Sequence, residues 1–280
     1  MRLFLLTLLV MCAFAANSVL NRLAIVGAGI DPLVFAALRL GSGALALGLM
    51  VRQRGQGMVF RGRRRALGAL ALLIYMIGFS LAYLALEAGA GALILFGGVQ
   101  VTMFAGALWS NEAVPFRRWA GAVMALCGLV WLLWPGSGVG LIGLWPALSM
   151  AAAAVGWGIY SLVGRGERDP LAATAANFIL ALPGAALLAV LLAVPGGGLP
   201  VQGVMLAVLS GVVTSGAGYA LWYRILPELG AARAAVAQLT VPVIAALAGM
   251  GLLAERPGMD FLVAALLVLG GVGLSVIRKG

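Results

Sequence analysis

The chain has 280 residues, of which 64% are hydrophobic and 9% are charged, and its mean hydropathy is +1.13. A soluble domain carries roughly a quarter charged residues, so this composition excludes a soluble globular protein and indicates an integral membrane protein. The formal net charge of +10 does not indicate nucleic-acid binding, because six of the 18 basic residues fall within 52–65 and most of the others flank apolar runs.

Ten apolar runs follow one another along the chain, separated by short segments that contain Gly, Pro or Arg. A helix needs about 20 mostly apolar residues to cross a bilayer, and each run is close to that length. The predicted spans are residues 3–26, 32–51, 66–86, 90–110, 117–134, 141–163, 170–193, 201–223, 231–253 and 258–277. We therefore predict an all-α integral membrane protein with ten transmembrane helices.

The basic residues divide unequally between the two ends of these spans. Fifteen fall on the side of the N-terminus, whereas only Arg22 and Arg256 fall on the other side and Arg39 lies within the second span. Positive charge is enriched in cytoplasmic loops. The pattern predicts a multi-pass protein of the bacterial inner membrane with both termini in the cytoplasm.

The two halves of the sequence resemble each other. Asp31-Pro32-Leu33 begins the second span and Asp169-Pro170-Leu171 begins the seventh. Residues 96–112 align without gaps to residues 239–255, and both segments end in Glu. These matches predict two five-helix units, residues 1–138 and 139–280.

An odd number of spans per unit means that the second unit enters the membrane from the opposite side. The prediction is therefore an inverted repeat around a central cavity, an arrangement that is common in transporters. The first span also has the form of a secretory signal peptide, with Arg2 before it and Ala13-Phe14-Ala15 as a possible cleavage site. The repeat disfavours that alternative, because the first unit needs this span.

The sequence resembles the EamA-type branch of the drug/metabolite transporter superfamily, and within it the exporters of aromatic amino acids. The resemblance rests on the two five-span units, on the endings at Glu112 and Glu255, on Arg39, and on the Trp157-Gly158 pair. It implies a cavity formed by the first, third, fourth, sixth, eighth and ninth spans, with the fifth and tenth spans peripheral. The second unit departs from the pattern, because Asn177 stands at the counterpart of Arg39.

Several polar and aromatic residues lie inside the predicted cavity-forming spans. Polar groups are costly in lipid and often mark a functional site. We predict that the substrate-binding residues are Asn17, Tyr75, Phe79, Gln100, Trp157, Tyr160 and Gln238. The alternative is that the amides join helices and the aromatic residues mark the headgroup region.

Three charged residues receive a structural or gating role. Arg39 lies well inside the second span, where it holds helices together, extends toward the interface or binds a substrate carboxylate; the structural role is favoured. Glu112 and Glu255 end the aligned segments and are expected at the boundary of the cavity, with helix capping as the alternative.

The chemistry of the chain argues against several other functions. It contains no histidine, and its eight acidic residues all lie at span ends or in loops, so no titrating group is expected at the midplane. We therefore expect facilitated diffusion of a small molecule by a monomer without a cofactor, a metal or nucleic acid. The resemblance implies that this molecule is an amino acid and that it is exported. The alternatives are proton-coupled export of other metabolites or drugs, a membrane protein that does not transport, and an intramembrane enzyme.

Overall fold

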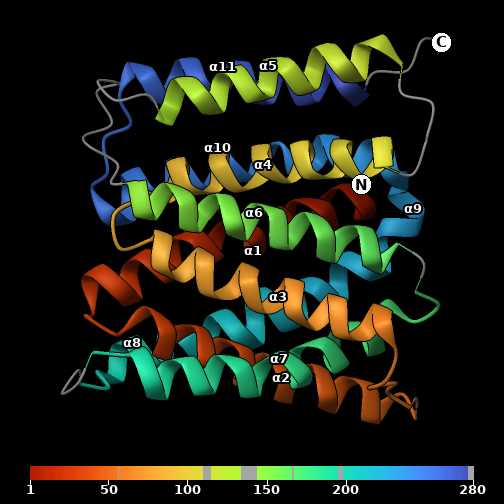
Figure 1. Cartoon of the computed structure of the whole chain (residues 1–280), viewed down its shortest axis with the longest axis vertical. Coiled ribbons are helices and arrows are strands. Elements are labelled where there is room, and N and C mark those ends of the chain that lie inside the picture. The colour runs from red at the N-terminus through yellow and green to blue at the C-terminus, as the bar shows by residue number, and fades with distance from the viewer. Residues whose placement is uncertain (56, 110–114, 134–143, 166, 195–197, 277–280) are drawn as a thin grey trace.

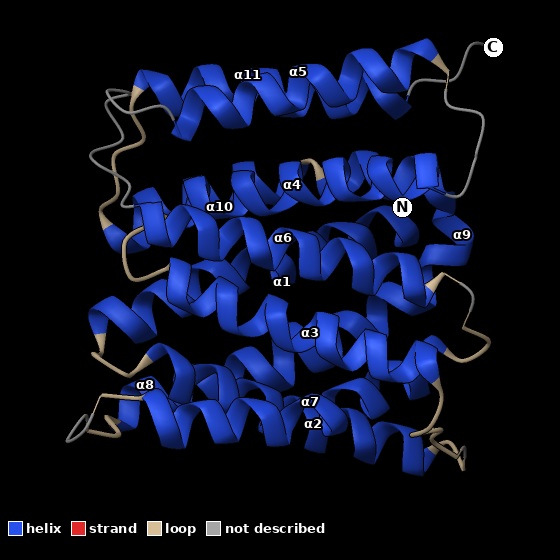
Figure 2. Cartoon of the chain, in the orientation of Figure 1, coloured by secondary structure: helices blue, strands red, loops and turns tan. Residues whose placement is uncertain are grey.

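The computed structural model describes residues 1–55, 57–109, 115–133, 144–165, 167–194 and 198–276. Within these ranges the chain is helical and has no strands (Figure 2). The elements are α1 (Arg2–Arg22), η1 (Leu23–Gly27), α2 (Pro32–Gln53), α3 (Arg63–Ala82), α4 (Ala88–Trp109), α5 (Phe116–Leu133), α6 (Leu144–Gly164), α7 (Pro170–Leu192), α8 (Val201–Leu209), η2 (Ser210–Ala217), α9 (Gly218–Gln238), α10 (Thr240–Leu253) and α11 (Met259–Val276). The segments η1 and η2 are π-helical.

The spans agree with the sequence prediction in most of their bounds. Over the described residues, nine helical stretches are long and apolar enough to cross a membrane. The tenth predicted span forms α11, whose apolar stretch Met259–Leu274 is shorter than the others. The predicted break near 224–230 is wrong, because α9 continues as a helix to Gln238 despite Pro227.

The Asp-Pro-Leu tripeptides begin helices at opposite sides of the molecule. Asp31 Oδ1 accepts a hydrogen bond from the Leu33 backbone N–H at 2.8 Å, and Asp169 Oδ1 accepts one from that of Ala172 at 3.1 Å. A proline follows each aspartate, at a position where its missing N–H leaves no helical bond unmade. We call the side that contains residues 52–65 the arginine-rich side, and the side that contains Gly27 and Pro32 the opposite side.

The helices lie roughly parallel in a bundle with one separate pair (Figure 1). α5 and α11 pack on each other at one end of the bundle and contact α4. Toward the other end, α4 packs on α10, α3 on α6, and α2 on α7. The α3–α6 contact is close: a Cβ on Gly156 would lie 2.7 Å from the Ala71 carbonyl oxygen. α1 runs through the centre of the bundle, where it contacts η2, α9 and α10 (Figure 1).

Candidate functional site

A central cavity lies where α1, α3, α4, α6 and α9 meet. Its lining residues are Phe14, Asn17, Ser18, Tyr75, Phe79, Leu95, Phe96, Trp157 and Tyr219. It leaves about 20 Å³ of room, which is enough for about one water molecule. Four of the predicted substrate-binding residues, Asn17, Tyr75, Phe79 and Trp157, therefore meet at one place, and side chains fill most of the space between them.

Aromatic rings form the wall of this cavity on two sides. The Tyr75 ring lies 4.8 Å from that of Trp157 and 5.4 Å from that of Phe79, and Trp157 lies 5.3 Å from Tyr219. Phe14 of α1 contacts Tyr219 edge to face. Tilted and edge-to-face pairs of this kind are the favoured geometries of aromatic contacts, so the rings form one continuous surface that suits a flat or apolar ligand.

Asn17 joins the first half of the chain to the π-helical segment η2. Its side-chain oxygen accepts hydrogen bonds from Ser210 Oγ at 2.9 Å and from Thr214 Oγ1. One turn further along α1, Asn21 accepts a hydrogen bond from Ser80 Oγ of α3 at 3.1 Å. Asn17 is 3% exposed, so these bonds satisfy its carbonyl oxygen. π-Helical turns occur frequently at functional sites, and η2 directs both hydroxyls at α1.

Arg39 of α2 is fully buried behind the aromatic wall. Its Nε donates to Ser215 Oγ of η2 at 3.1 Å, and its Nη2 donates to the Tyr75 hydroxyl at 3.3 Å. The guanidinium carbon lies 5.7 Å from the Tyr75 ring centre and 5.3 Å from that of Phe79. Arg39 therefore does not extend to the interface, and it sits beside two of the cavity-lining residues.

Two glycines allow α2 to approach η2 this closely. A Cβ on Gly211 would overlap Ser42 Oγ and the Arg39 carbonyl oxygen, and a Cβ on Gly43 would lie 3.1 Å from the Gly211 carbonyl oxygen. Any larger residue at either position would separate the two helices. The small residues thus place Ser215 within reach of Arg39.

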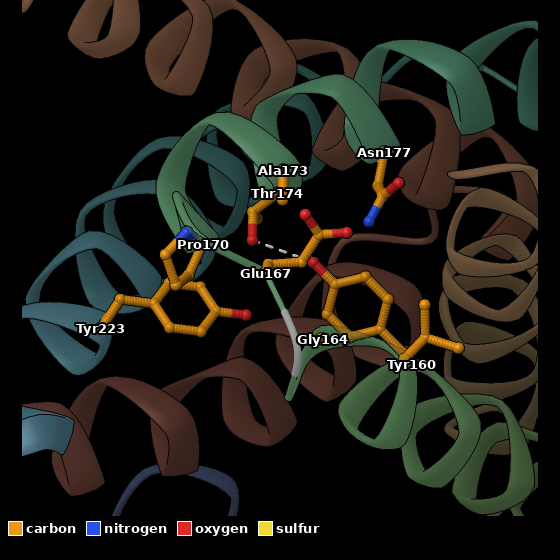
Figure 3. Close-up of a pocket in the computed structure, with 9 residues that line it drawn as sticks. Tyr160, Gly164, Glu167, Pro170, Ala173, Thr174, Asn177 and Tyr223 are labelled. Carbon is orange, nitrogen blue, oxygen red and sulfur yellow. Dashed lines mark hydrogen bonds between the residues drawn. The ribbon is translucent and has the colours of Figure 1, made fainter. Parts of the chain in front are cut away.

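A second, smaller cavity is lined by residues of α6, α7 and α9 and by Glu167 (Figure 3). Tyr160 of α6 donates to Thr174 Oγ1 of α7 at 3.0 Å, and Tyr223 and Asn177 face the same space. Trp157 and Tyr160 stack with ring centres 5.3 Å apart. Because Trp157 lines the central cavity and Tyr160 the second one, this stacked pair separates the two spaces.

Arg65, at the start of α3, contacts three of the residues that line this cavity. Its guanidinium contacts Glu167 Oε1 at 3.1 Å, the Ala173 carbonyl at 3.0 Å and Asn177 Oδ1 at 3.2 Å, while Nε donates to the Val59 carbonyl. These bonds tie α3 of the first half to α7 of the second. Sequence analysis counted Arg65 only as a loop charge.

On the opposite side of the molecule, Glu255, which follows α10, joins the second half of the chain to the first. Its carboxylate accepts the Ala88 backbone N–H at the start of α4, with oxygens 2.9 and 3.0 Å away, and lies 3.6 Å from Arg22 Nε. Arg22 Nη1 also donates to the Tyr83 carbonyl at 3.0 Å. Burial raises the pKa of the Glu255 carboxyl above its usual range, and the nearby negative charge of Glu87 raises it further. The hydrogen bond from Ala88 acts in the other direction and lowers this pKa.

The remaining predicted residues lie elsewhere. Gln100 and Gln238 are half-buried and line neither cavity, and Glu112 lies outside the described residues. Sequence analysis did not identify the hydroxyl groups of Ser210, Thr214 and Ser215. Their only sequence signal is a cluster of hydroxyl residues with Gly211 in an apolar span, a pattern that equally suits helix packing.

Comparisons with known proteins place the chain among membrane transporters. Residues 144–277 match the EamA-like transporter family. The chain is 46% identical over 280 residues to an uncharacterised protein, PA1977, of Pseudomonas aeruginosa, covering 99% of this chain and 96% of that one. It is 26% identical to an uncharacterised transporter of Archaeoglobus fulgidus, covering 89% and 90% of the two chains. It is 23% identical to the uncharacterised transporter YoaV of Bacillus subtilis, covering 88% and 87%.

The fold of the chain is also similar to that of a solved structure, which is described only as the crystal structure of a protein. The two structures superpose with a TM-score of 0.70 over 96% of this chain and 97% of the other, at 23% sequence identity. The likeness extends over the whole bundle, including the first half, which the family match does not cover.

Proposed function

The chain belongs to the EamA-like transporter family, and from that premise we propose that it exports small amphipathic metabolites, including aromatic amino acids, by alternating access. It is a multi-pass membrane transporter; the substrate, the direction and the mechanism are the proposal. The observation that carries the proposal is the central cavity, where Tyr75, Phe79 and Trp157 offer aromatic surface beside the amide of Asn17. A zwitterion with a large side chain matches both features.

The pairing of helices supports two inverted five-helix repeats, residues 1–138 and 139–280. In such a repeat, the second, fourth and fifth spans of the first unit pack on the equivalent spans of the second unit. The contacts α2–α7, α4–α10 and α5–α11 are of this kind. The contact of the third span with the sixth, α3–α6, corresponds to that of the eighth with the first, η2–α1. Alternating access then exchanges two related closures around one central site.

Each side of the molecule has a closure that suits this mechanism. Glu255 and Arg22 join the halves on the opposite side, and Arg65 and Glu167 join them on the arginine-rich side. We place the arginine-rich side in the cytoplasm of a bacterial inner membrane, since basic residues are retained there. The protein acts as a monomer in this proposal, because one chain supplies the complete cavity.

Facilitated diffusion is favoured because all eight acidic residues lie at span ends or in loops. Proton-linked export is the second candidate, and the raised pKa of the Glu255 carboxyl favours it. When buried, that carboxyl binds a proton more readily than it does when exposed, so it could take up a proton as the cavity closes and release it as the cavity opens.

The test is flux of labelled amino acids into proteoliposomes that contain only this protein. We expect phenylalanine or tryptophan to equilibrate down its gradient faster than alanine, with no pH gradient imposed. Accumulation of substrate against its gradient, lost when an imposed pH gradient is collapsed, supports the proton-linked candidate instead. Failure of any amino acid to cross faster than through protein-free liposomes contradicts the substrate assignment.

A further inference from the structure

Arg39 carries a positive charge in the interior without a matching negative one. Its side chain is fully buried, and its bonds are made to the hydroxyls of Ser215 and Tyr75. Over the described residues, no carboxylate lies within ion-pair distance of it. A guanidinium stays charged in proteins, and burying a charge without an opposite charge is strongly unfavourable.

One nitrogen of Arg39 also lacks any hydrogen-bond partner. Nη1 is buried, and no acceptor among the described residues reaches it. Buried polar groups are nearly always hydrogen-bonded, and an exception points to a role that the protein alone does not fulfil. The rings of Tyr75 and Phe79 stabilise the cation partially through their faces, but they offer Nη1 no acceptor.

Arg65 shows how a structural arginine is held in the same protein. It is 7% exposed, and its bonds end on two carbonyls, an amide oxygen and the Glu167 carboxylate. Arg39 contacts none of these groups. The difference between the two buried arginines argues against helix fastening as the main role of Arg39, which sequence analysis had favoured.

The position of Arg39 connects it to the cavity. Tyr75 and Phe79 contact the guanidinium and also line the central cavity. The Tyr75 oxygen accepts the Nη2 hydrogen bond, so this hydroxyl joins the guanidinium directly to the wall of the cavity. These two side chains therefore stand between the cavity and the guanidinium.

Resting on the transport function proposed above, the geometry points to Arg39 as the group that binds a substrate carboxylate. A planar guanidinium binds a carboxylate through two parallel hydrogen bonds, and the aromatic wall accepts the apolar part of the same molecule. The cavity therefore selects aromatic carboxylates, with or without an ammonium group. It excludes their amides and amines, because these lack the negative charge that Arg39 requires.

The experiment measures binding separately from transport. Purified protein in detergent is melted with 3-phenylpropionate, which has a carboxylate, and with 3-phenylpropanamide, which has the same shape without the charge. A ligand that binds only the folded state raises the melting temperature. We expect the carboxylate to bind at least tenfold more tightly than the amide.

Variants assign that preference to a residue. Arg39→Gln should remove the preference, and Arg39→Lys should keep part of it because the charge remains without the paired donors. Arg64→Gln is the control: it removes an exposed arginine of the same charge, to which no part of the site is assigned, and should leave the preference unchanged. Equal stabilisation of the wild-type protein by amide and carboxylate, or by neither, overturns the inference without any variant, as does a preference retained in Arg39→Gln.

The outcome is distinguishable from failure of the proposed function. If binding is carboxylate-specific and depends on Arg39, but phenylalanine does not cross proteoliposomes, the anion site stands and the transport proposal fails. If phenylalanine crosses while phenylalaninamide crosses equally fast in the wild-type protein, transport stands and the role of Arg39 is wrong.

Discussion

Replacing Glu255 with alanine should open the cavity toward the opposite side. The carboxylate accepts the Ala88 N–H at 2.9 and 3.0 Å and faces Arg22 at 3.6 Å. A hydrogen bond to a charged group contributes about 1.5–3 kcal/mol, and a partly exposed ion pair adds about 1 kcal/mol or less. A loss of about 2 kcal/mol from the closed form changes the ratio of closed to open molecules about thirtyfold.

Glutamine at the same position should not open the gate. It keeps an acceptor for Ala88, and the raised pKa of the Glu255 carboxyl means that a neutral side chain is easier to bury there than a charged one. The closed form is therefore stabilised by the hydrogen bond that residue 255 accepts from the Ala88 N–H, and not by the negative charge of Glu255. This difference between the two substitutions is the sharpest consequence of the geometry.

The assay is the rate at which a cysteine in the central cavity reacts with a membrane-impermeant maleimide added outside cells. Ser18→Cys supplies the reporter, in a chain whose Cys12 and Cys127 are replaced. Glu255→Ala should react at least tenfold faster than the parent, while Glu255→Gln and the neighbouring control Glu87→Gln should react at the parent rate. Equal acceleration by alanine and glutamine at 255 refutes the hydrogen-bond account, and no acceleration by alanine refutes the gate.

External pH tests the same closure with a defined sign. The Glu255 carboxyl has a raised pKa in the closed form, so this form binds a proton more readily than an open form with an exposed carboxyl. Acidification therefore favours closure, and the effect is lost as the pH rises through the raised pKa. Maleimide reacts with the thiolate, so every cysteine reacts more slowly in acid, and the parent rate is therefore divided by the rate of Glu255→Gln at the same pH. This ratio for the Ser18→Cys reporter should fall as external pH falls toward 4.5, the ordinary value.

Three further predictions test the topology, the aromatic wall and the helix packing. Cysteine at Leu199 should react with the external maleimide, whereas cysteine at the equally exposed Val59 should react only after permeabilisation; the reverse pattern inverts the assigned orientation. Phe79→Ala should slow phenylalanine flux several-fold and alanine flux less, since an aromatic contact contributes about 0.5–1.5 kcal/mol beyond burial. If the variant is expressed normally and both fluxes are slowed equally, the substitution has instead disturbed the packing of the protein. Gly211→Ala should lower stability by about 1–3 kcal/mol, because its Cβ would overlap Ser42 and the Arg39 carbonyl, whereas Gly48→Ala, with open space around it, should not lower the melting temperature.

The sequence predicted the helices far better than their faces. Apolar length and the Asp-Pro starts located the spans, because bilayer thickness and capping are local constraints. A helix that is apolar all round carries no periodic signal that separates cavity from lipid. Gln100 was consequently assigned to the cavity on the basis of its depth in the span, although it lines neither cavity.

The contacts of the site depend on residues that are distant in the chain. Arg39 pairs with Ser215, and Asn17 with Ser210 and Thr214, and no local pattern predicts that these helices meet. Arg65 was hidden among neighbouring arginines, where burial of one member leaves no trace in the sequence. By contrast, Tyr75 and Phe79 were both predicted to bind the substrate, and they do line the cavity together.

The central claim is that one cavity is exposed alternately to the two sides of the membrane. The most direct test labels the Ser18→Cys reporter from outside in intact cells and from the cytoplasmic side in inverted vesicles, each with and without phenylalanine. The account predicts reaction from both sides, with protection by the substrate in both cases. Reaction from one side only, or reaction that phenylalanine leaves unchanged on both sides, would contradict it.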